Sequence, residues 1–180
     1  MQLGLAILLP DDAHNAVRRL QLQIALACGG NPALKQYPHV TLKQPFHAKA
    51  LEPIEAYFDE LVRAMPPLRI DMEGVGRFEE DEVAFVEVQD SASLEQVRLG
   101  VLRDLGKRFR VKPRDVEGDR YRFHATLAYN LPPGTFERAW EAVRDTEVHL
   151  SFEAETYGLF YYTGEEWILY KRATASPARQ

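Results

Sequence analysis

The sequence predicts a fold in which strands and helices make two similar lobes that face each other across a cleft. Three observations lead to this prediction. The apolar residues follow strand spacing and helix spacing in turn along the chain. Both halves of the chain repeat the same order of elements, which is strand, helix, strand, helix, strand. The pattern His-x-Thr-Leu occurs once in each half, at residues 39–42 and 124–127, and each copy lies in an apolar, strand-like run.

The first half of the chain contains five predicted elements. An apolar run makes the first strand, and Asp11 or Asp12 caps the helix that follows. Two glycines directly after Cys28 end this helix, and two consecutive prolines stop the second helix after Met65. The predicted elements are a strand at 2–9, a helix from 11 or 12 to 28, a strand at 37–43, a helix at 52–65 and a strand at 68–76.

The second half begins again with a strand and repeats the order. Its first helix places Leu94, Val97, Val101 and Leu105 at helical spacing, which indicates one apolar face. The last residues of the chain are polar and small, so we expect a flexible tail at 173–180. The predicted elements are a strand at 82–89, a helix at 92–109, a strand at 120–129, a helix at 134–144 and strands at 147–160 and 166–172.

The composition is that of an ordinary globular domain. The 180 residues are 46% hydrophobic and 27% charged, and we expect one domain over residues 1–180, with lobes at 1–78 and 82–172. Cys28 is the only cysteine, which excludes an internal disulfide and most zinc-binding patterns. The apolar start runs into two aspartates, so we expect neither a signal peptide nor a membrane span. We therefore expect a monomeric, cytoplasmic protein without membrane association.

Charge is distributed unevenly along the chain. A net charge of −5 argues against a protein that coats long nucleic acids, because such proteins usually carry a basic excess. The segment from Lys107 to Arg122 nevertheless holds seven basic and only three acidic residues, and it leads directly into the second motif. Such a segment is either a grip for RNA or ordinary solvated surface.

Each motif separates polar from apolar side chains, because side chains alternate between the two faces of a strand. A single His-x-Thr strand would most often be structural, but a matched pair in equivalent surroundings favours a functional site. If the lobes face each other, the two polar faces meet across the cleft. These predicted polar faces are His39, Thr41 and Lys43 in the first motif and Arg120, Arg122, His124 and Thr126 in the second.

These residue types suit chemistry on a phosphodiester. An imidazole with an ordinary pKa near 6.5 can remove or deliver a proton around neutral pH, so two of them can do both in one reaction. The threonine hydroxyls can donate hydrogen bonds to oxygens on which charge builds up in a pentacovalent phosphorus transition state. Lys43, Arg120 and Arg122 can add positive charge for the same oxygens.

Paired His-x-Thr motifs, one in each half, resemble the 2H phosphoesterase superfamily, and in particular its 2′-5′ RNA ligase and cyclic phosphodiesterase branch. The resemblance covers nearly the whole chain by layout, and the two motifs carry its specificity. It implies a bilobal α+β fold with an antiparallel sheet and helices in each lobe, related by a pseudo-two-fold axis. It also implies metal-independent, cofactor-free chemistry on 2′,3′-cyclic phosphates or 2′-5′ linkages of RNA ends or nucleotides. The catalytic residues that it implies are His39, Thr41, His124 and Thr126.

We therefore expect an enzyme in which the neutral histidine deprotonates water or an RNA 5′-hydroxyl, while the protonated one donates to the departing ribose oxygen. Which histidine is the base, and whether the reaction is hydrolysis or 2′-5′ ligation, stays open. So do a different small substrate, such as ADP-ribose cyclic phosphate or 2′-5′ oligoadenylate, and a nucleotide- or RNA-binding module without turnover. A metal-dependent hydrolase is disfavoured, because carboxylate or cysteine ligands at suitable spacing are missing around the two histidines.

Several other residues are candidates for contact with the substrate. Phe46 follows Lys43 closely and joins it, with Arg120 and Arg122, as a substrate-binding candidate. Tyr129 should point away from the cleft if its strand is regular. We expect one or two of the clustered aromatic residues near the C-terminus to face the ligand and the others to close the core. This cluster consists of Tyr157, Phe160, Tyr161, Tyr162, Trp167 and Tyr170.

Overall fold

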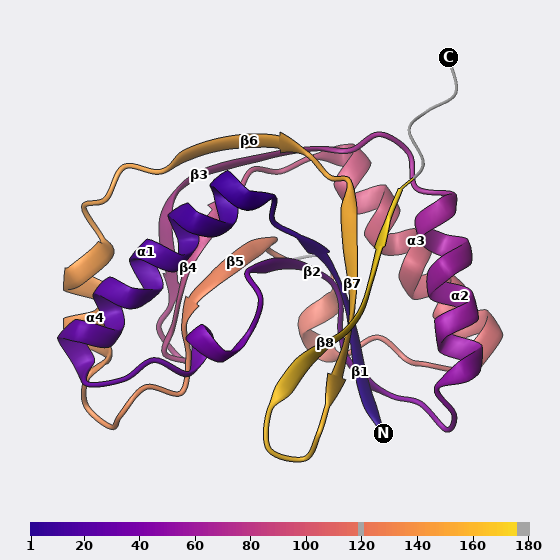
Figure 1. Ribbon diagram of the computed structural model, residues 1–180, viewed down its shortest axis with the longest axis horizontal. Coiled ribbons are helices and arrows are strands. Elements are labelled where there is room, and N and C mark those ends of the chain that lie inside the picture. Colours follow the sequence, from indigo (N-terminus) through magenta and orange to yellow (C-terminus); the bar gives the residue numbers. More distant parts are fainter. Residues whose placement is uncertain (119–120, 176–180) are drawn as a thin grey trace.

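The computed structural model describes residues 1–118 and 121–175, and within them eight strands form one antiparallel sheet (Figure 1). The strand order is β6-β3-β4-β5-β2-β1-β7-β8. The strands are β1 (Gln2–Leu8), β2 (His39–His47), β3 (Arg69–Phe78), β4 (Val83–Val88), β5 (His124–Ala128), β6 (His149–Glu153), β7 (Thr156–Tyr162) and β8 (Trp167–Thr174). This arrangement confirms the α+β class with antiparallel strands.

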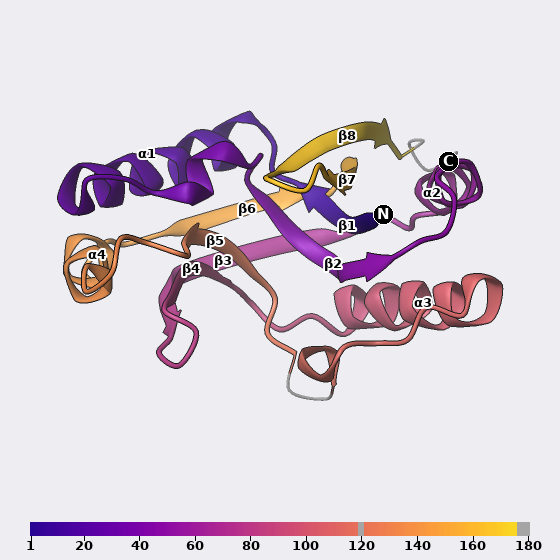
Figure 2. The same cartoon turned by 90° about the horizontal axis from the view of Figure 1, so that it is seen from below.

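Four α-helices and two short 3₁₀ helices lie in the described residues. The helices α1 and α4 pack against each other beside β5, whereas α2 lies against β7 and β8, and α3 lies against β2 (Figures 1 and 2). The helices are α1 (Asp11–Cys28), α2 (Glu52–Arg63), α3 (Ala92–Phe109) and α4 (Phe136–Val143), with η1 at Pro32–Lys35 and η2 at Asp115–Glu117.

The two lobes do not follow the two halves of the sequence, so the predicted division at 1–78 and 82–172 is wrong. β3 belongs to the first half of the chain but pairs with β4 and β6. Only residues 79–82 join β3 to β4, and so short a turn can connect only neighbouring antiparallel strands. β7 belongs to the second half but pairs with β1. The first half of the chain therefore supplies β3 to the side of the sheet that holds β4, β5 and β6, and the second half supplies β7 and β8 to the side that holds β1 and β2.

Element ends differ from the prediction at a few places. The first helix begins at Asp11 with Pro10 at the N-cap position, so Asp11 and Asp12 lie in its first turn, where their charge complements the helix dipole, and do not cap it. The strand predicted at 120–129 covers only His124–Ala128. β8 continues to Thr174, so the tail predicted at 173–180 begins too early. Residues 176–180 lie outside the described residues.

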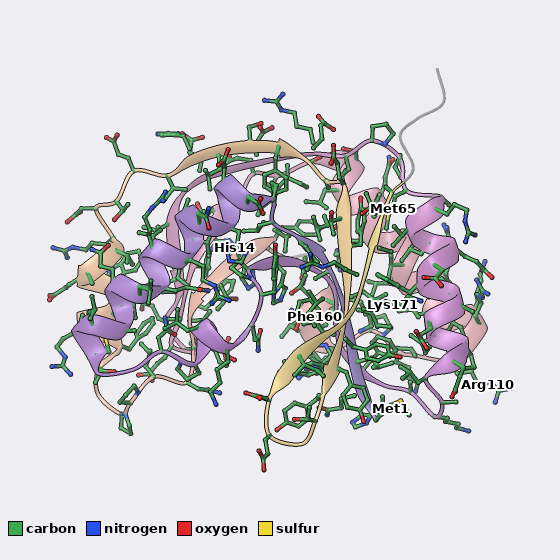
Figure 3. All side chains as sticks on the ribbon, viewed as in Figure 1. Met1, His14, Met65, Arg110, Phe160 and Lys171 are labelled. Atoms are coloured by element: carbon green, nitrogen blue, oxygen red, sulfur yellow. The ribbon has the colours of Figure 1, made fainter. Side chains whose placement is uncertain are left out.

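The hydrophobic core fills the space between the helices and the sheet (Figure 3). Apolar residues of β1, the most enclosed strand, are almost fully buried, including Leu3, Leu5 and Ile7. On α1 the buried positions recur at helical spacing, as at Val17, Leu20 and Ile24, which explains why this helix lies flat on the sheet. Within the described residues no helix is both long and apolar enough to cross a membrane.

Candidate active site

The two motifs meet in the middle of the sheet, where β2 lies next to β5. Val40 pairs with Ala125 in antiparallel register, and both side chains are fully buried in the core. Continuing this register by one residue in each direction places His39 opposite Thr126 and Thr41 opposite His124. The structure thus brings together the four motif residues on one face of the sheet, although 85 positions (124 − 39) separate the two histidines in the chain.

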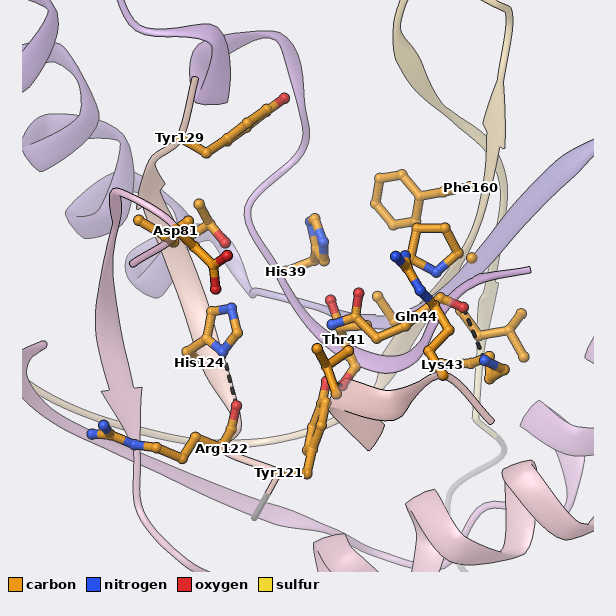
Figure 4. A pocket seen from close by; sticks show the side chains of 18 of the residues that line it. His39, Thr41, Lys43, Gln44, Asp81, Tyr121, Arg122, His124, Tyr129 and Phe160 are labelled. Atoms are coloured by element: carbon orange, nitrogen blue, oxygen red, sulfur yellow. Dashed lines mark hydrogen bonds between the residues drawn. The ribbon is translucent and has the colours of Figure 1, made fainter. Parts of the chain in front are cut away.

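These four residues line a single cleft of about 820 Å³. Figure 4 shows the rings of His39 and His124 on either side of a common space, with Thr41 beside it. Around the histidines lie aromatic side chains from other strands and loops, and charged residues from the loop that contains η2. The cleft is large enough for a nucleotide-sized ligand.

The two imidazoles are held in the same way. Nδ1 of His39 lies 2.7 Å from the carbonyl oxygen of Tyr37, and Nδ1 of His124 lies 2.8 Å from the carbonyl oxygen of Arg122. A carbonyl oxygen can only accept, so each Nδ1 must donate its proton. In the neutral ring Nε2 is then the unprotonated nitrogen. Both histidines therefore have an Nε2 atom that can exchange a proton with a ligand.

Aromatic rings fix the orientation of both imidazoles. The ring of His39 packs on Phe160, with 4.7 Å between the ring centroids. The ring of His124 packs on Phe78 and Phe85, at 5.3 Å and 5.0 Å. These contacts limit the rotation of the histidines and leave the proton-transfer positions preorganised.

Burial changes the proton affinity of both histidines. Desolvation lowers the pKa of His39 to about 4, helped by the nearby His124 and opposed by the hydrogen bond to the Tyr37 carbonyl. Desolvation also lowers the pKa of His124, and the charge of Arg122 acts in the same direction. Without a ligand both rings are therefore neutral at pH 7. A bound phosphate anion favours the protonated form and so raises both pKa values.

The backbone on either side of the cleft is fixed by buried polar groups. Tyr121 donates its hydroxyl proton to the carbonyl of Thr41 at 2.9 Å, and Gln21 donates its side-chain amide to the carbonyl of Thr126 at 2.9 Å. Asn31 donates to the carbonyl of Leu127 at 2.8 Å. Each motif strand is thus held by a residue distant in sequence, which fixes the backbone that carries the threonine side chains.

Lys43 does not lie where strand alternation predicted it. The pairing of β1 with β2 shifts register between Thr41 and Lys43, which marks a bulge. The bulge reverses the alternation, so that Lys43 is only 1% exposed while Gln44 takes the next position along the cleft. Lys43 is still among the residues that line the cleft, but its ammonium group is buried against Glu117 and is not exposed beside His39 and Thr41 as predicted.

The ammonium group of Lys43 is bound within the protein. It donates to Glu117 at 2.6 Å, and both side chains are 1% exposed. The Glu117 carboxylate also accepts from the backbone N–H groups of Gln44 and Arg114, both at 2.8 Å. This pair fastens the loop that contains η2 to β2, and the loop contributes Arg114 to the cleft wall.

The remaining predicted contacts have different outcomes. Arg122 lines the cleft, but its guanidinium pairs with Glu87 and lies over Phe85. Phe46 is 4% exposed and belongs to the hydrophobic core, so its prediction as a cleft residue is wrong, because a second register shift between Lys43 and Phe46 reverses the faces of β2 again. Arg120 lies outside the described residues.

Sequence reasoning missed several residues that line the cleft. Tyr129 follows the last residue of β5, and its hydroxyl accepts a hydrogen bond from Gln36 at 2.8 Å. The expectation that Tyr129 points away from the cleft is wrong, because the regular strand ends at Ala128. Phe160 and Trp167 line the cleft, as expected for one or two members of the aromatic cluster, whereas Tyr157 is buried in the core.

Comparison with known proteins places the chain in a family. The family model of the 2′-5′ RNA ligase superfamily matches residues 9–166, a range that includes both motifs. The chain belongs to the 2′-5′ RNA ligase superfamily. A comparison with curated proteins found no match. Among residues 1–118 and 121–175, no cluster of three or more histidine, cysteine or carboxylate side chains is placed to hold a metal ion.

Solved structures of similar fold agree with this membership of the superfamily. A protein of Thermus thermophilus is 16% identical, with a TM-score of 0.67 and 97% of each chain covered. LigT of E. coli in complex with 3′-AMP is 15% identical, with a TM-score of 0.67 and 98% of each chain covered. A structure described as a phosphoesterase is 18% identical, with a TM-score of 0.57 and 98% coverage of each chain. At these identities the comparison establishes the fold.

Proposed function

We propose that this member of the 2′-5′ RNA ligase superfamily opens 2′,3′-cyclic phosphates of RNA ends or nucleotides by acid–base catalysis between His39 and His124, without metal or ATP. The observation that carries the proposal is the diagonal placement of two imidazoles, each opposite a threonine, around one cleft. Diagonal side chains of neighbouring antiparallel strands stand about 7–8 Å apart at their backbones. That spacing leaves room for one phosphate between the two rings.

In the proposed reaction His39 is the general base. Desolvation lowers its pKa to about 4 and keeps Nε2 unprotonated, so it can take a proton from water as the water oxygen bonds to phosphorus. The bond from phosphorus to the ribose O3′ breaks, and O3′ takes the proton that Nε2 of His124 holds in the complex. The product is a ribose 2′-phosphate, and one proton has passed from water to His39 and one from His124 to the sugar. Solvent exchange then restores both rings.

The threonines and the charge of the cleft complete the site. The hydroxyls of Thr41 and Thr126 are placed to donate to the non-bridging phosphate oxygens, where charge builds up in the transition state. Arg114 lines the same cleft and contributes positive charge. Because Lys43 and Arg122 are paired with Glu117 and Glu87, Arg114 and the protonated His124 are the cationic groups assigned to the phosphate.

The aromatic side of the cleft suits a nucleoside. Phe160 packs on the ring of His39, and Trp167 and Tyr129 also line the cleft. Aromatic faces of this kind can stack a nucleobase. Structures of E. coli LigT have been determined with 3′-AMP, NADP⁺ and ATP, which supports a nucleotide as the ligand here. If an RNA 5′-hydroxyl replaces water, the same two histidines would join the ends through a 2′-5′ linkage, as the name of the superfamily suggests.

The test is direct. Adenosine 2′,3′-cyclic phosphate is incubated with the protein in excess chelator and without ATP, and the phosphorus resonances are followed by NMR. The proposal predicts loss of the cyclic resonance and growth of a single 2′-phosphate resonance. Turnover that stops when the chelator is added would favour a metal-dependent hydrolase. Binding without turnover would favour a nucleotide-binding module and would overturn the proposed activity.

A further inference from the structure

A second groove adjoins the cleft on the side of α3. It lies between α3 and the loop that contains η2, and it shares Arg114, Asp115 and Gly118 with the cleft. Its floor is apolar and includes Leu99, which is 49% exposed. We call this surface the α3 groove. It is lined by Leu99, Leu102, Arg103, Lys107, Pro113 and Arg114, among others.

The α3 groove lies in the most basic stretch of an acidic protein. Over the whole chain 22 basic residues face 27 acidic ones, but residues 103–114 contain six basic residues and one acidic residue. Three of the six, Arg103, Lys107 and Arg114, line the groove, together with Asp115 and with Glu117, whose carboxylate is paired with Lys43. Arg103 and Lys107 are four residues apart on α3, so both stand on the same face of the helix, next to Leu99. The only acidic residue in this stretch, Asp104, forms an exposed pair with Arg103 at 3.5 Å, and such pairs are weak.

The opposite side of the cleft is acidic. The turn between β3 and β4 contains Glu79, Glu80, Asp81 and Glu82, and Asp81 lines the cleft on the side of His124 (Figure 4). Figure 2 shows this turn and the α3 side of the molecule well apart, on opposite sides of β5. A polyanion that has one end in the cleft is therefore repelled on one side and attracted on the other.

We propose that the α3 groove is a second binding site for an RNA substrate, and that the nucleotides on the 5′ side of the cyclic phosphate leave the cleft past Arg114 and lie in it. This proposal rests on the proposed function and adds the site that holds the strand outside the cleft. The apolar floor suits the faces of unpaired bases, and the basic rim of Arg103, Lys107 and Arg114 suits the phosphates that connect them. A mononucleotide fills the cleft alone and does not reach the groove.

The test compares two substrates on two variants. The substrates are adenosine 2′,3′-cyclic phosphate and a five-nucleotide RNA that ends in the same cyclic phosphate. The groove variant is Arg103→Glu with Lys107→Glu. The matched control is Arg19→Glu with Arg138→Glu, which changes the net charge equally on exposed positions of α1 and α4 that line neither the cleft nor the α3 groove.

For the wild type we expect kcat/KM to be at least about tenfold higher for the RNA than for the mononucleotide at low salt, since each bound phosphate adds electrostatic affinity. The groove variant should lose most of this advantage while its mononucleotide rate stays within about twofold of wild type. The logarithmic salt dependence of the RNA rate should also flatten by about 0.7 for each phosphate that the variant no longer neutralises. The control variant should keep the preference for RNA.

Two results would overturn the proposed role of the α3 groove in RNA binding. One is equal use of both substrates by the wild type, and the other is a loss of RNA activity in the groove variant that the control matches. Failure of both substrates to react would instead refute the proposed function. To keep the groove testable in that case, binding of the same five-nucleotide RNA with a 3′-phosphate end is measured by fluorescence anisotropy. In this experiment the groove variant should bind the RNA more weakly than the control variant does. Equal binding by the two variants would contradict the proposed role of the groove.

Discussion

His39 and His124 are anchored by the same hydrogen bond, from Nδ1 of each ring to the backbone carbonyl two residues earlier in the chain. The equivalence follows from the shared strand geometry of the two motifs, and it fixes the same ring nitrogen, Nε2, as the one that exchanges protons. Their surroundings differ, however. His39 packs on Phe160, whereas His124 packs against Phe78 and Phe85, which contact each other, and lies near Arg122. This difference separates the roles that we assign to the two rings.

The first prediction concerns pH. The base His39 must be neutral, so kcat/KM should rise as the pH rises through its pKa of about 4. The acid His124 must be protonated, so kcat/KM should fall as the pH rises through its pKa, which burial holds below the ordinary 6.5. The profile of kcat/KM should therefore be bell-shaped with its maximum below pH 6.5. A profile that rises steadily to pH 8 would contradict the assigned pair.

The second prediction concerns the threonines. Thr41→Ala and Thr126→Ala should each lower kcat by roughly 10² to 10³, the usual cost of one donor to a developing oxyanion. Thr41→Ser and Thr126→Ser keep the hydroxyl and should retain most of the rate. Thr174→Ala, at an exposed position of β8, serves as the control. If the alanine and serine variants were equally active, the hydroxyls would have no role in the transition state.

The third prediction concerns the buried ion pair. Lys43→Met leaves the carboxylate of Glu117 buried without its cation, and we expect the free energy of unfolding to fall by about 3–5 kcal/mol. Arg108→Met breaks an exposed pair with Glu60 and should cost no more than about 1 kcal/mol. Urea denaturation of both variants measures the difference. A cost for Lys43→Met that does not exceed that of the surface variant would refute a structural role of the pair.

The fourth prediction concerns the aromatic side of the cleft. Trp167→Ala removes a stacking surface, and we expect the binding of 3′-AMP to weaken by about 1–3 kcal/mol while the binding of inorganic phosphate is unchanged. Tyr170→Ala provides the control, because Tyr170 is on the same strand but does not line the cleft. Isothermal titration calorimetry with both ligands separates the outcomes. Equal losses for 3′-AMP and phosphate would place Trp167 in contact with the phosphate and contradict base stacking.

The sequence predicted the helices and strands well. It predicted which side chains of the motif strands face the cleft only where those strands are regular. Alternation correctly separated His39 and Thr41 from Val40, because the pairing of β2 is regular there. It failed at Lys43, because a bulge of one residue reverses the faces of a strand. The local sign was Pro45, since proline inside a central strand is confined to bulges. It failed at Tyr129 because the strand ends one residue earlier than its apolar pattern does.

The division into lobes could not be derived from the internal repeat. Two halves with the same order of elements are compatible both with separate lobes and with exchanged strands, since the order along the chain is identical in both. The short turn at 79–82 carried the relevant information, because it requires β3 and β4 to be neighbours. Contacts between distant residues, such as the ion pair of Lys43 with Glu117, likewise have no local signal in the sequence.

The central claim is that two imidazoles share the work of opening one cyclic phosphate, and the most direct measurement is the turnover of adenosine 2′,3′-cyclic phosphate by single histidine variants in chelator. We predict that His39→Ala and His124→Ala each lower kcat by about 10² to 10⁴, the usual contribution of a general acid or base. His149→Ala, at an exposed position of β6, should remain fully active. Turnover at the wild-type rate by either His39→Ala or His124→Ala would contradict the claim.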